Sequence, residues 1–365
     1  MTRKTYIIAE AGVNHNGSLQ MAFDLVDAAT EAGADAVKFQ TFQADQLVTK
    51  EAKQATYQEK NMGESMSQYE MLKQLELSHD EFIQLQDYCE QKKITFLSTP
   101  FDLQSVDFLI ETLKLHTIKI PSGELSNAPY IYKIASHGVN MILSTGMATM
   151  EEIHQALAFI AFGLAKKEPI TLQSVQDYYE TEEAKALLKD KVTILHCTTE
   201  YPTPVEEINL ASIDYLKNET GLEAGLSDHS DGIVVPVAAV ARGAVMIEKH
   251  FTLNKNLPGP DHKASLEPSE LKEMIQAIRQ VERAIGSFDK KPSSVEIKNK
   301  QVARKSLVAI RSIQAGERFT AENMTIKRPG NGISPVFYWD YLGRQADKDY
   351  KEDELIQSCE KNDQS

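Results

Sequence analysis

The stretch IKIPSGE, residues 118–124, contains a contradiction from which the fold can be inferred. Its two isoleucines belong in a buried strand, yet Lys119 lies between them, and Ser122 and Glu124 follow directly. An unpaired ammonium group costs several kcal/mol to bury, so Lys119 should face an anion or a carboxylate. An apolar strand with a polar end is typical of a barrel whose mouth binds a ligand.

Eight short apolar runs, most of them with a polar end, lie between residues 6 and 251. They are YIIAEAG (6–12), AVKFQTF (36–42), TFLSTPF (95–101), HTIKIPSG (116–123), NMILSTG (140–146), VTILHCTTE (192–200), EAGLSDH (223–229) and AVMIEKHF (244–251). Each run is too short for a helix and too apolar for a surface strand. This pattern fits a parallel sheet that is covered on its outer face.

Helical patterns separate these runs. Ser78 with Glu81 and Thr149 with Glu152 predict capping boxes, and a long amphipathic helix ends near residue 285. Eight strand–helix pairs within this length predict a (β/α)8 TIM barrel. The alternative is a doubly wound open sheet, which usually has fewer strands, and no G-x-G-x-x-G motif follows the first run.

The predicted organisation is a barrel at residues 1–285, a linker at 286–302, a small β-rich domain at 303–357 and a tail at 358–365. The linker sequence GSFDKKPSSVEIKNK is polar and rich in turn-forming residues. Two segments exceed ordinary barrel loops. Residues 43–77 follow the second strand on the catalytic face, where we expect a lid. Residues 163–191 fall on the opposite face, where we expect extra structural helices.

The chain has 365 residues and a formal net charge of −14. This charge argues against nucleic acid or an anionic membrane as a partner, since either would require a basic surface. No apolar run reaches the ~20 residues of a membrane span, and the first apolar run is too short for a signal peptide. The three cysteines, Cys89, Cys197 and Cys359, predict reduced thiols in the cytoplasm.

The active site of a TIM barrel lies at the carboxyl ends of its strands, and here those ends are polar. They carry Glu10, Lys38, Thr99, Lys119, Ser122, Glu124, Ser144, Tyr201, Ser227, His229, Glu248 and His250. Lys38 and Lys119 with the neighbouring hydroxyls predict a phosphate or carboxylate site. The alternative is a pair of structural lysines that bridge Glu10 or Glu248.

His229 and His250 end adjacent strands, so they are candidate ligands of one divalent metal. Two satisfied core histidines are the alternative. Glu124 is a candidate general acid or base, or else a salt-bridge partner of Lys119. We expect Cys197 to be a small core residue, because no strong base flanks it in the sequence.

Two loop segments add candidates. PGPDHKAS, residues 258–265, places Asp261 after the eighth strand, on the catalytic face. RPGNGIS, residues 328–334, is rich in turn-forming residues and carries Arg328. Arg328 either lies on a surface turn, which sequence physics favours, or reaches into a barrel mouth.

The motifs taken together resemble the sialic acid synthase family, which includes N-acetylneuraminate, legionaminate and pseudaminate synthases. They are AEAGVNHNG, VKFQTF, STPFD, KIPSGE, LSTGM, HCTTEYPTP, LSDHS, IEKHFTL, GPDHKAS and KRPGNGIS, in this order. The similarity runs from Ile7 to about Ile356, and residues 303–357 resemble the family's antifreeze-like SAF domain, a β-clip fold.

The resemblance implies an enzyme, a transferase that uses phosphoenolpyruvate to form a carbon–carbon bond. Phosphoenolpyruvate condenses with an N-acetylated hexosamine and water, and phosphate leaves by C–O cleavage. With N-acetylmannosamine the product is N-acetylneuraminate. A divalent metal, Mn²⁺ in most members and Mg²⁺ or Co²⁺ in others, polarises the aldehyde oxygen of the sugar.

The resemblance also implies roles for individual residues. His229 and His250 match the metal ligands, and Glu124 matches the carboxylate that handles the proton of the attacking water. Residues that match the phosphoenolpyruvate contacts are Lys38, Thr99, Lys119, Ser122, Ser144 and Ser227. Those on the sugar side are Glu10, Tyr201 and Asp261. We group Glu10 and Lys119 with Glu124 as catalytic residues.

Arg328 matches an arginine that the SAF domain of the partner subunit supplies to the sugar, which implies a domain-swapped homodimer. One departure concerns Thr199, where some members have asparagine, so a phosphoenolpyruvate contact is unassigned there.

Three functions stay open at this level. N-acetylneuraminate synthase is the first hypothesis. N,N'-diacetyllegionaminate synthase, which uses 2,4-diacetamido-2,4,6-trideoxymannose, is the second, and a non-catalytic sugar-binding protein is the third. The two sugars differ at carbons 4 and 6, where the second has an acetamido and a methyl group. A hydrophobic lining of the sugar site would therefore favour the second sugar.

Overall fold

The computed structural model describes residues 4–55, 58 and 66–357. The tail at 358–365, with Cys359, and the middle of the predicted lid therefore lie outside the described residues. The chain divides into two compact units, Met1–Gly286 and Ser287–Ser365.

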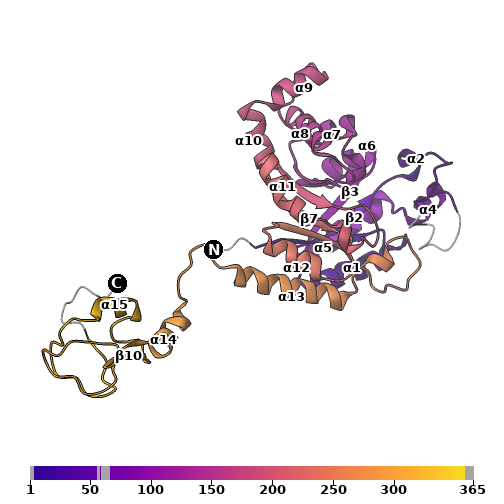
Figure 1. The fold of residues 1–365 in the computed structure, drawn as a ribbon. Helices are drawn as coiled ribbons and strands as arrows, with labels where there is room; N and C mark the ends of the chain where they lie inside the picture. Colours follow the sequence, from indigo (N-terminus) through magenta and orange to yellow (C-terminus); the bar gives the residue numbers. More distant parts are fainter. Residues whose placement is uncertain (1–3, 56–57, 59–65, 358–365) are drawn as a thin grey trace. The chain divides into compact units, whose positions relative to one another are not determined.

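The first unit is an eight-stranded parallel barrel, as predicted (Figure 1). Its strands follow the order β3-β2-β1-β8-β7-β6-β5-β4, and β3 also contacts β4. The strands are β1 Tyr6–Gly12, β2 Ala36–Thr41, β3 Thr95–Pro100, β4 Thr117–Ile120, β5 Asn140–Ser144, β6 Val192–Cys197, β7 Glu223–Asp228 and β8 Met246–His250.

Helices surround the barrel and cover the outer face of its sheet (Figure 1). They are α1 Leu19–Ala32, α5 His79–Lys92, α6 Leu103–Asp107, α7 Ala128–Ser136, α8 Met150–Leu164, α11 Ala211–Thr220, α12 Val234–Ala241 and α13 Pro268–Ile285, with the π-helical turn η1 Phe108–Thr112. Both predicted capping boxes are present, at Ser78 before α5 and at Thr149 before α8.

The inside of the barrel changes character along the strands. Ile8, Leu97, Ile142 and Leu195 form a buried apolar cluster inside it. Because side chains on one face of a strand recur at every second residue, Glu10 points to the same side as Ile8, one step closer to the mouth. The barrel therefore has an apolar floor and a polar mouth.

The two long segments differ in what they build. Residues 43–77 contribute α2 Ala44–Leu47 and α4 Gln68–Leu75, beside the carboxyl ends of the strands. Residues 163–191 contribute α9 Leu172–Tyr179 and α10 Glu182–Lys191, which contact α8, so the prediction of extra helices is confirmed.

The second unit is small and rich in turns. β9 Ser306–Ala309 pairs antiparallel with β10 Met324–Lys327, and η5 Pro335–Phe337 precedes α15 Tyr338–Tyr341. Its core consists of Leu307, Ala309, Ile313, Phe319, Met324, Ile333, Tyr341, Ala346, Tyr350 and Ile356. The segment predicted as a linker contains a helix, α14 Ser294–Ala303, which begins with a capping box of Ser293 and Glu296.

Among the described residues, no helix combines the length and the apolar character that a membrane crossing requires.

Candidate active site

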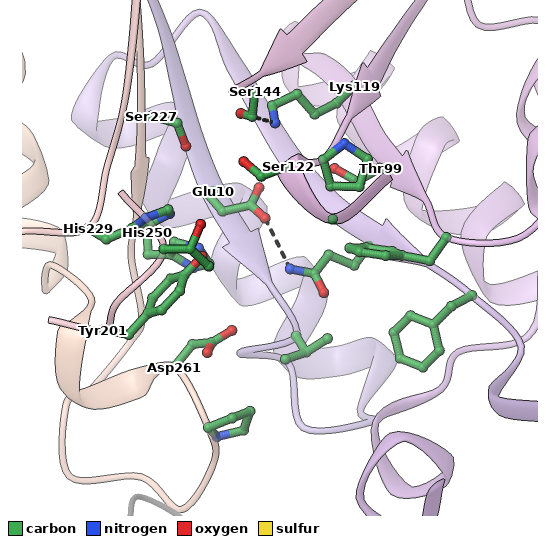
Figure 2. A pocket seen from close by; sticks show the side chains of 18 of the residues that line it. Glu10, Thr99, Lys119, Ser122, Ser144, Tyr201, Ser227, His229, His250 and Asp261 are labelled. Atoms are coloured by element: carbon green, nitrogen blue, oxygen red, sulfur yellow. Dashed lines mark hydrogen bonds between the residues drawn. The ribbon is translucent and has the colours of Figure 1, made fainter. Parts of the chain in front are cut away.

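A cavity of about 330 Å³ opens at the carboxyl ends of the barrel strands. Figure 2 shows the labelled side chains converging on it, with His229, His250 and Tyr201 on one side and Lys119 and Ser144 on the other. Of the predicted site residues, the cavity is lined by Glu10, Lys38, Thr99, Lys119, Ser122, Ser144, Tyr201, Ser227, His229, His250 and Asp261. Residues from all eight strands or from the loops that follow them therefore meet in one place.

Lys38 is the centre of a buried charge cluster. Its Nζ lies 2.7 Å from Glu10 Oε2 and 3.7 Å from Glu248 Oε2, and it donates a hydrogen bond to Thr99 Oγ1 at 2.9 Å. Burial opposes a charge on Lys38, but the two carboxylates outweigh it and raise the pKa of Lys38. Lys38 is therefore a permanent cation at the mouth.

Lys119, the lysine between the two isoleucines of β4, belongs to the same cluster. Its Nζ donates to Ser144 Oγ at 2.6 Å and lies 3.6 Å from Glu248 Oε1, which also accepts a hydrogen bond from Ser227 at 2.8 Å. Burial, together with the charge of Lys38, lowers the pKa of Lys119 below its ordinary value, although Glu248 opposes this shift. Its salt-bridge partner is Glu248, not Glu124.

The two carboxylates of the cluster titrate in opposite directions. Burial and the charge of Glu248 raise the pKa of Glu10 to about 7 against the attraction of Lys38. Burial alone would also raise the pKa of Glu248, but Lys119 and Lys38 outweigh it and lower that pKa to about 2. Glu248 is therefore a fixed anion, while Glu10 can exchange a proton near neutral pH.

The histidines carry donor atoms that fit a divalent metal. Their ring centres are 5.5 Å apart. His229 Nδ1 donates to the carbonyl oxygen of Thr198 at 2.7 Å, which leaves its Nε2 as a lone-pair donor. His250 Nδ1 is buried without a hydrogen-bond partner among the described residues, and burial lowers the pKa of His250 well below 6.5, so its ring is neutral. Burial would lower the pKa of His229, but Cys197 and the carbonyl of Thr198 outweigh it and raise that pKa above its ordinary value. Two imidazole rings in their deprotonated form suit a first-row divalent metal.

Within the described part of the chain, the one set of three ligand-type side chains within 4.8 Å of one another lies elsewhere. It consists of Asp107, Glu111 and His137, from α6, η1 and the end of α7. Asp107 forms an ion pair with Lys133 at 2.6 Å. This set lies on the helices and does not line the cavity, so it is separate from the predicted metal site.

Asp261 lies on the loop after β8, and hydrogen bonds join this loop to the loop after β1. Asn14, after β1, donates to the carbonyl of Phe251 at 2.8 Å and to Ser265 Oγ at 2.9 Å. His262 makes a further contact of 3.0 Å with Asn16 Oδ1. Burial raises the pKa of Asp261 to about 6, against the effect of His229.

Within the barrel unit, the structure does not bring the predicted Glu124 to the cavity lining. Glu124 lies in η2 Ser122–Glu124, where its Oε2 accepts a hydrogen bond from Asn127 Nδ2 at 2.6 Å. It is not among the lining residues. Arg328 is an exposed residue of the turn after β10, in the second unit. The roles of Glu124 and Arg328 stay predictions.

Sequence reasoning missed the position of Cys197. We expected a core thiol without a neighbouring base, but Cys197 lines the cavity and its Sγ lies 3.8 Å from His229 Nδ1. Cys197 is buried, as predicted. The expectation that no base lies near it was wrong, because His229 directly follows β7, the strand on which Ser227 pairs with Cys197. Thr199 also lines the cavity, and its buried hydroxyl has no hydrogen-bond partner among the described residues.

A second missed feature is an apolar wall on the outer part of the cavity. It is formed by Val13, Phe42, Leu47, Val48, Met71, Leu72, Leu75 and Phe101. Most of these side chains also belong to one hydrophobic cluster that joins α2 and α4 to the barrel. We call this set the apolar wall. Leu47, Val48, Met71, Leu72 and Leu75 belong to the segment predicted as a lid, and the other three residues follow directly after β1, β2 and β3.

Comparisons with known proteins agree with this geometry. Residues 25–290 match the NeuB family, and residues 304–358 match the SAF domain. The chain is 49% identical to an N,N'-diacetyllegionaminic acid synthase of Campylobacter jejuni, over 97% of this chain and 99% of the relative. It is 45% identical to a protein of the same name from Legionella pneumophila, over 90% and 87% of the two chains.

A solved structure supports the same assignment. The N-acetylneuraminic acid (sialic acid) synthetase of Leptospira borgpetersenii matches with a TM-score of 0.66 and 30% identity, over 82% of this chain and 90% of that one. Both the sequence and the fold therefore lead to the same group of proteins: this chain belongs to the NeuB family and carries a C-terminal SAF domain.

Proposed function

We propose that this protein condenses phosphoenolpyruvate with an N-acetylated hexosamine and water to give a nine-carbon 2-keto acid and phosphate. It is thus a transferase of the sialic acid synthase kind. The observation that supports this proposal most directly is the pair of buried lysines with their hydroxyl partners, beside two histidines in one cavity. A binding protein without catalysis would not need the metal ligands at that place.

Lys38 and Lys119 bind the phosphate and carboxylate groups of phosphoenolpyruvate in this proposal. Thr99 and Ser144 accept hydrogen bonds from these lysines, and Ser122 Oγ accepts one from Gly146 N at 2.9 Å. The hydroxyl hydrogens of these residues can therefore turn toward an anion. An incoming anion also separates the lysines from Glu10 and Glu248, so binding exchanges one set of charge pairs for another.

His229 and His250 would hold a divalent metal, which we propose to be Mn²⁺, with Mg²⁺ and Co²⁺ as alternatives. When bound, the metal supplies Lewis-acid polarisation of the aldehyde oxygen of the open-chain sugar. Thr198 fixes the ring of His229 through its carbonyl oxygen. Tyr201 lies over both rings, with centroid distances of 4.1 Å to His229 and 5.7 Å to His250, and closes this side of the cavity.

Carbon 3 of phosphoenolpyruvate attacks the aldehyde, water adds at carbon 2, and the C–O bond to phosphate breaks. A carboxyl group near neutral pKa is suited to take and return the proton of that water. Glu10 meets this requirement better than Glu124, because it lines the cavity and its pKa is raised to about 7. We therefore propose Glu10 as the proton carrier.

Of the two sugars, the site favours 2,4-diacetamido-2,4,6-trideoxymannose, which would make the product N,N'-diacetyllegionaminate. A methyl group at carbon 6 can be buried against the apolar wall, whereas a hydroxymethyl group would lose hydrogen bonds to water there. The names of the Campylobacter and Legionella relatives point the same way. N-acetylneuraminate synthesis, the first hypothesis from sequence, stays the second candidate, supported by the Leptospira match.

We further propose that the enzyme works as a domain-swapped homodimer in the cytoplasm. α14 has no buried residue, and its apolar side chains Val295, Ile297 and Val302 are all exposed. Exposed apolar side chains on one helix are a candidate docking surface for a second copy. The described cysteines, Cys89 and Cys197, are free, as expected in a reducing compartment.

The test is phosphate release from phosphoenolpyruvate in the presence of Mn²⁺, with each of the two hexosamines in turn. A higher kcat/KM with the diacetamido sugar supports the legionaminate assignment, and a higher value with N-acetylmannosamine supports the second candidate. Folded, Mn²⁺-loaded protein that releases phosphate with neither sugar would contradict both.

A further inference from the structure

A fully buried ion pair lies behind the two histidines, and the proposed function gives it no role. Lys249 Nζ lies 2.6 Å from Asp228 Oδ2, and the two side chains are 0% and 2% exposed. Each residue directly precedes one of the histidines, His250 or His229. Because side chains alternate along a strand and the histidines line the cavity, the ion pair lies on the outer, helix-facing side of the barrel.

The pair is part of a small network that holds the ends of two strands. Asp228 and Lys249 are direct partners in the ladder between β7 and β8. Ser230 joins them: its backbone N donates to Asp228 Oδ1 at 3.1 Å, its Oγ donates to Asp228 Oδ2 at 2.9 Å, and its carbonyl oxygen accepts from Lys249 Nζ. The residues on both sides of His229 are thus tied to the residue before His250.

Stability alone does not account for this network. Replacing a buried ion pair by well-packed apolar residues is often neutral or stabilising, so an apolar contact would hold the strands equally well. β7 and β8 are in addition already joined by their ladder of backbone hydrogen bonds. The charged groups add directional hydrogen bonds, and these bonds fix the position of the end of β7 relative to the end of β8.

Two ligands of one metal ion must hold their donor atoms at a fixed distance and orientation. Their donor atoms come from different strands, so a small shift of one strand end changes the distance between them. Outer residues that orient metal ligands are worth about 10- to 100-fold in metal affinity when they are removed. In this site the ring of His229 is oriented by the Thr198 carbonyl, and none of the residues of the network is hydrogen-bonded to a histidine ring.

We propose that Asp228, Lys249 and Ser230 form a positioning clamp that sets the spacing of His229 and His250 for a shared divalent metal. The clamp acts through the backbone, by fixing the strand ends on which the ligands stand. This inference rests on the metal site of the proposed function, and it assigns three residues that touch neither substrate nor metal.

The test is direct Mn²⁺ binding to the full chain without substrates, measured as free Mn²⁺ by electron paramagnetic resonance. The double variant Asp228→Leu/Lys249→Met removes both charges and leaves neither one buried alone. We expect its Kd for Mn²⁺ to rise about 10- to 100-fold while the melting temperature of the metal-free protein stays close to that of the wild type. Ser230→Ala, which removes one hydrogen bond, should raise the Kd by about tenfold or less.

The matched control is Arg279→Met, which removes ion pairs to Asp35 and Glu282, both 2.8 Å long, at the opposite end of the barrel. Its Mn²⁺ affinity should equal that of the wild type. If the double variant does not fold, Ser230→Ala decides the question. Wild-type affinity in the folded clamp variants, or an equal loss in the control, would overturn the clamp. Failure of the wild-type protein to bind Mn²⁺ would instead overturn the metal site and the clamp with it.

Discussion

Lys38 Nζ lies 2.7 Å from Glu10 Oε2, and both side chains are almost completely buried at the mouth of the barrel. The contact is attractive, yet burial and the nearby Glu248 still raise the pKa of Glu10 to about 7. A substrate with two anionic groups therefore meets a site that can take up a proton as it binds. The proposed binding of phosphoenolpyruvate would therefore depend on pH through Glu10.

The first prediction concerns the pH dependence of stability. Because the pKa of Glu10 is raised in the fold from 4.5 to about 7, the folded protein holds this proton more tightly than the unfolded chain. The contribution of Glu10 to stability is full below about pH 4.5 and is lost as pH rises toward about 7. Glu10→Gln does not titrate, so its melting temperature should gain several degrees relative to wild type across that window.

Thermal unfolding of both proteins in metal-free buffers at several pH values measures this difference. Other buried groups, such as Asp261, titrate in both proteins and cancel in the comparison. Glu248 does not interfere, since its pKa is lowered to about 2 and its contribution is lost only in more acidic solution. A constant difference between the two melting temperatures would show that Glu10 is ionised throughout.

The second prediction concerns Lys119. Lys119→Met leaves Glu248 with Lys38 as its remaining cation and removes a direct partner of the substrate anion. Truncating one member of a buried charge pair costs about 2 to 5 kcal/mol, so KM for phosphoenolpyruvate should rise by at least about 30-fold. KM for the sugar should change little. Lys133→Met, at a partly exposed ion pair with Asp107, is the control. An effect confined to the sugar would contradict the assignment.

The third prediction concerns the metal ligands. His250→Ala should lose Mn²⁺ affinity by more than the ~100-fold that an outer residue is worth, with turnover falling in parallel. Isothermal titration with Mn²⁺ measures the affinity directly. The control is His154→Asn, at a histidine of α8 that does not line the cavity and whose Nδ1 contacts Tyr179. This variant should bind Mn²⁺ with the wild-type affinity. Unchanged affinity in the His250 variant would remove it from the metal site.

The fourth prediction concerns the apolar wall. Leu72→Asn places an amide in the cavity lining, in the middle of α4. Loss of an apolar contact is worth about 10- to 200-fold in specificity, so kcat/KM should fall more for the 6-deoxy diacetamido sugar than for N-acetylmannosamine. Leu172→Asn, at a residue that is 60% exposed, should leave the ratio unchanged. Equal losses with both sugars would mean that the wall does not select between them.

The sequence predicted the barrel and most of its mouth because both follow simple rules. Parallel strands end at one edge, and alternation places Ser227 with His229, and Glu248 with His250, on the same side of their strands. It named ion pairs of the two lysines with Glu10 or Glu248 as an alternative, and the structure contains such pairs. It did not predict which lysine meets which carboxylate, because that depends on how far the side chains reach across the barrel.

These rules did not predict the position of Glu124 or the existence of the apolar wall. Glu124 follows Lys119 closely in sequence, but the chain leaves the strand after Ile120 and enters a 3₁₀ turn, where the carboxylate bonds Asn127. Most of the wall comes from residues after β2, and their sequence does not determine which side chains face the cavity. Both outcomes depend on loop geometry, which hydrophobic patterning does not determine.

The last prediction concerns the partner subunit. Arg328 belongs to the second unit, and the family resemblance implies that it completes the site of the other copy. An Arg328→Ala chain mixed with a His250→Ala chain should then form heterodimers in which one site has both an intact barrel and an intact arginine. We expect activity to recover to about a quarter of the wild-type value after random pairing, because such pairing makes about half of the dimers mixed and each mixed dimer has one complete site.

Native mass spectrometry of differently tagged chains shows whether mixed dimers form, and phosphate release measures the recovery. Mixing the Arg328→Ala chain with Arg328→Ala/His250→Ala is the matched control, since no pairing then yields a complete site. If mixed dimers form without recovery, the arginine acts within its own chain or outside the site, and the swapped arrangement is wrong. Recovery only with the intact arginine would show that each active site is built from two chains.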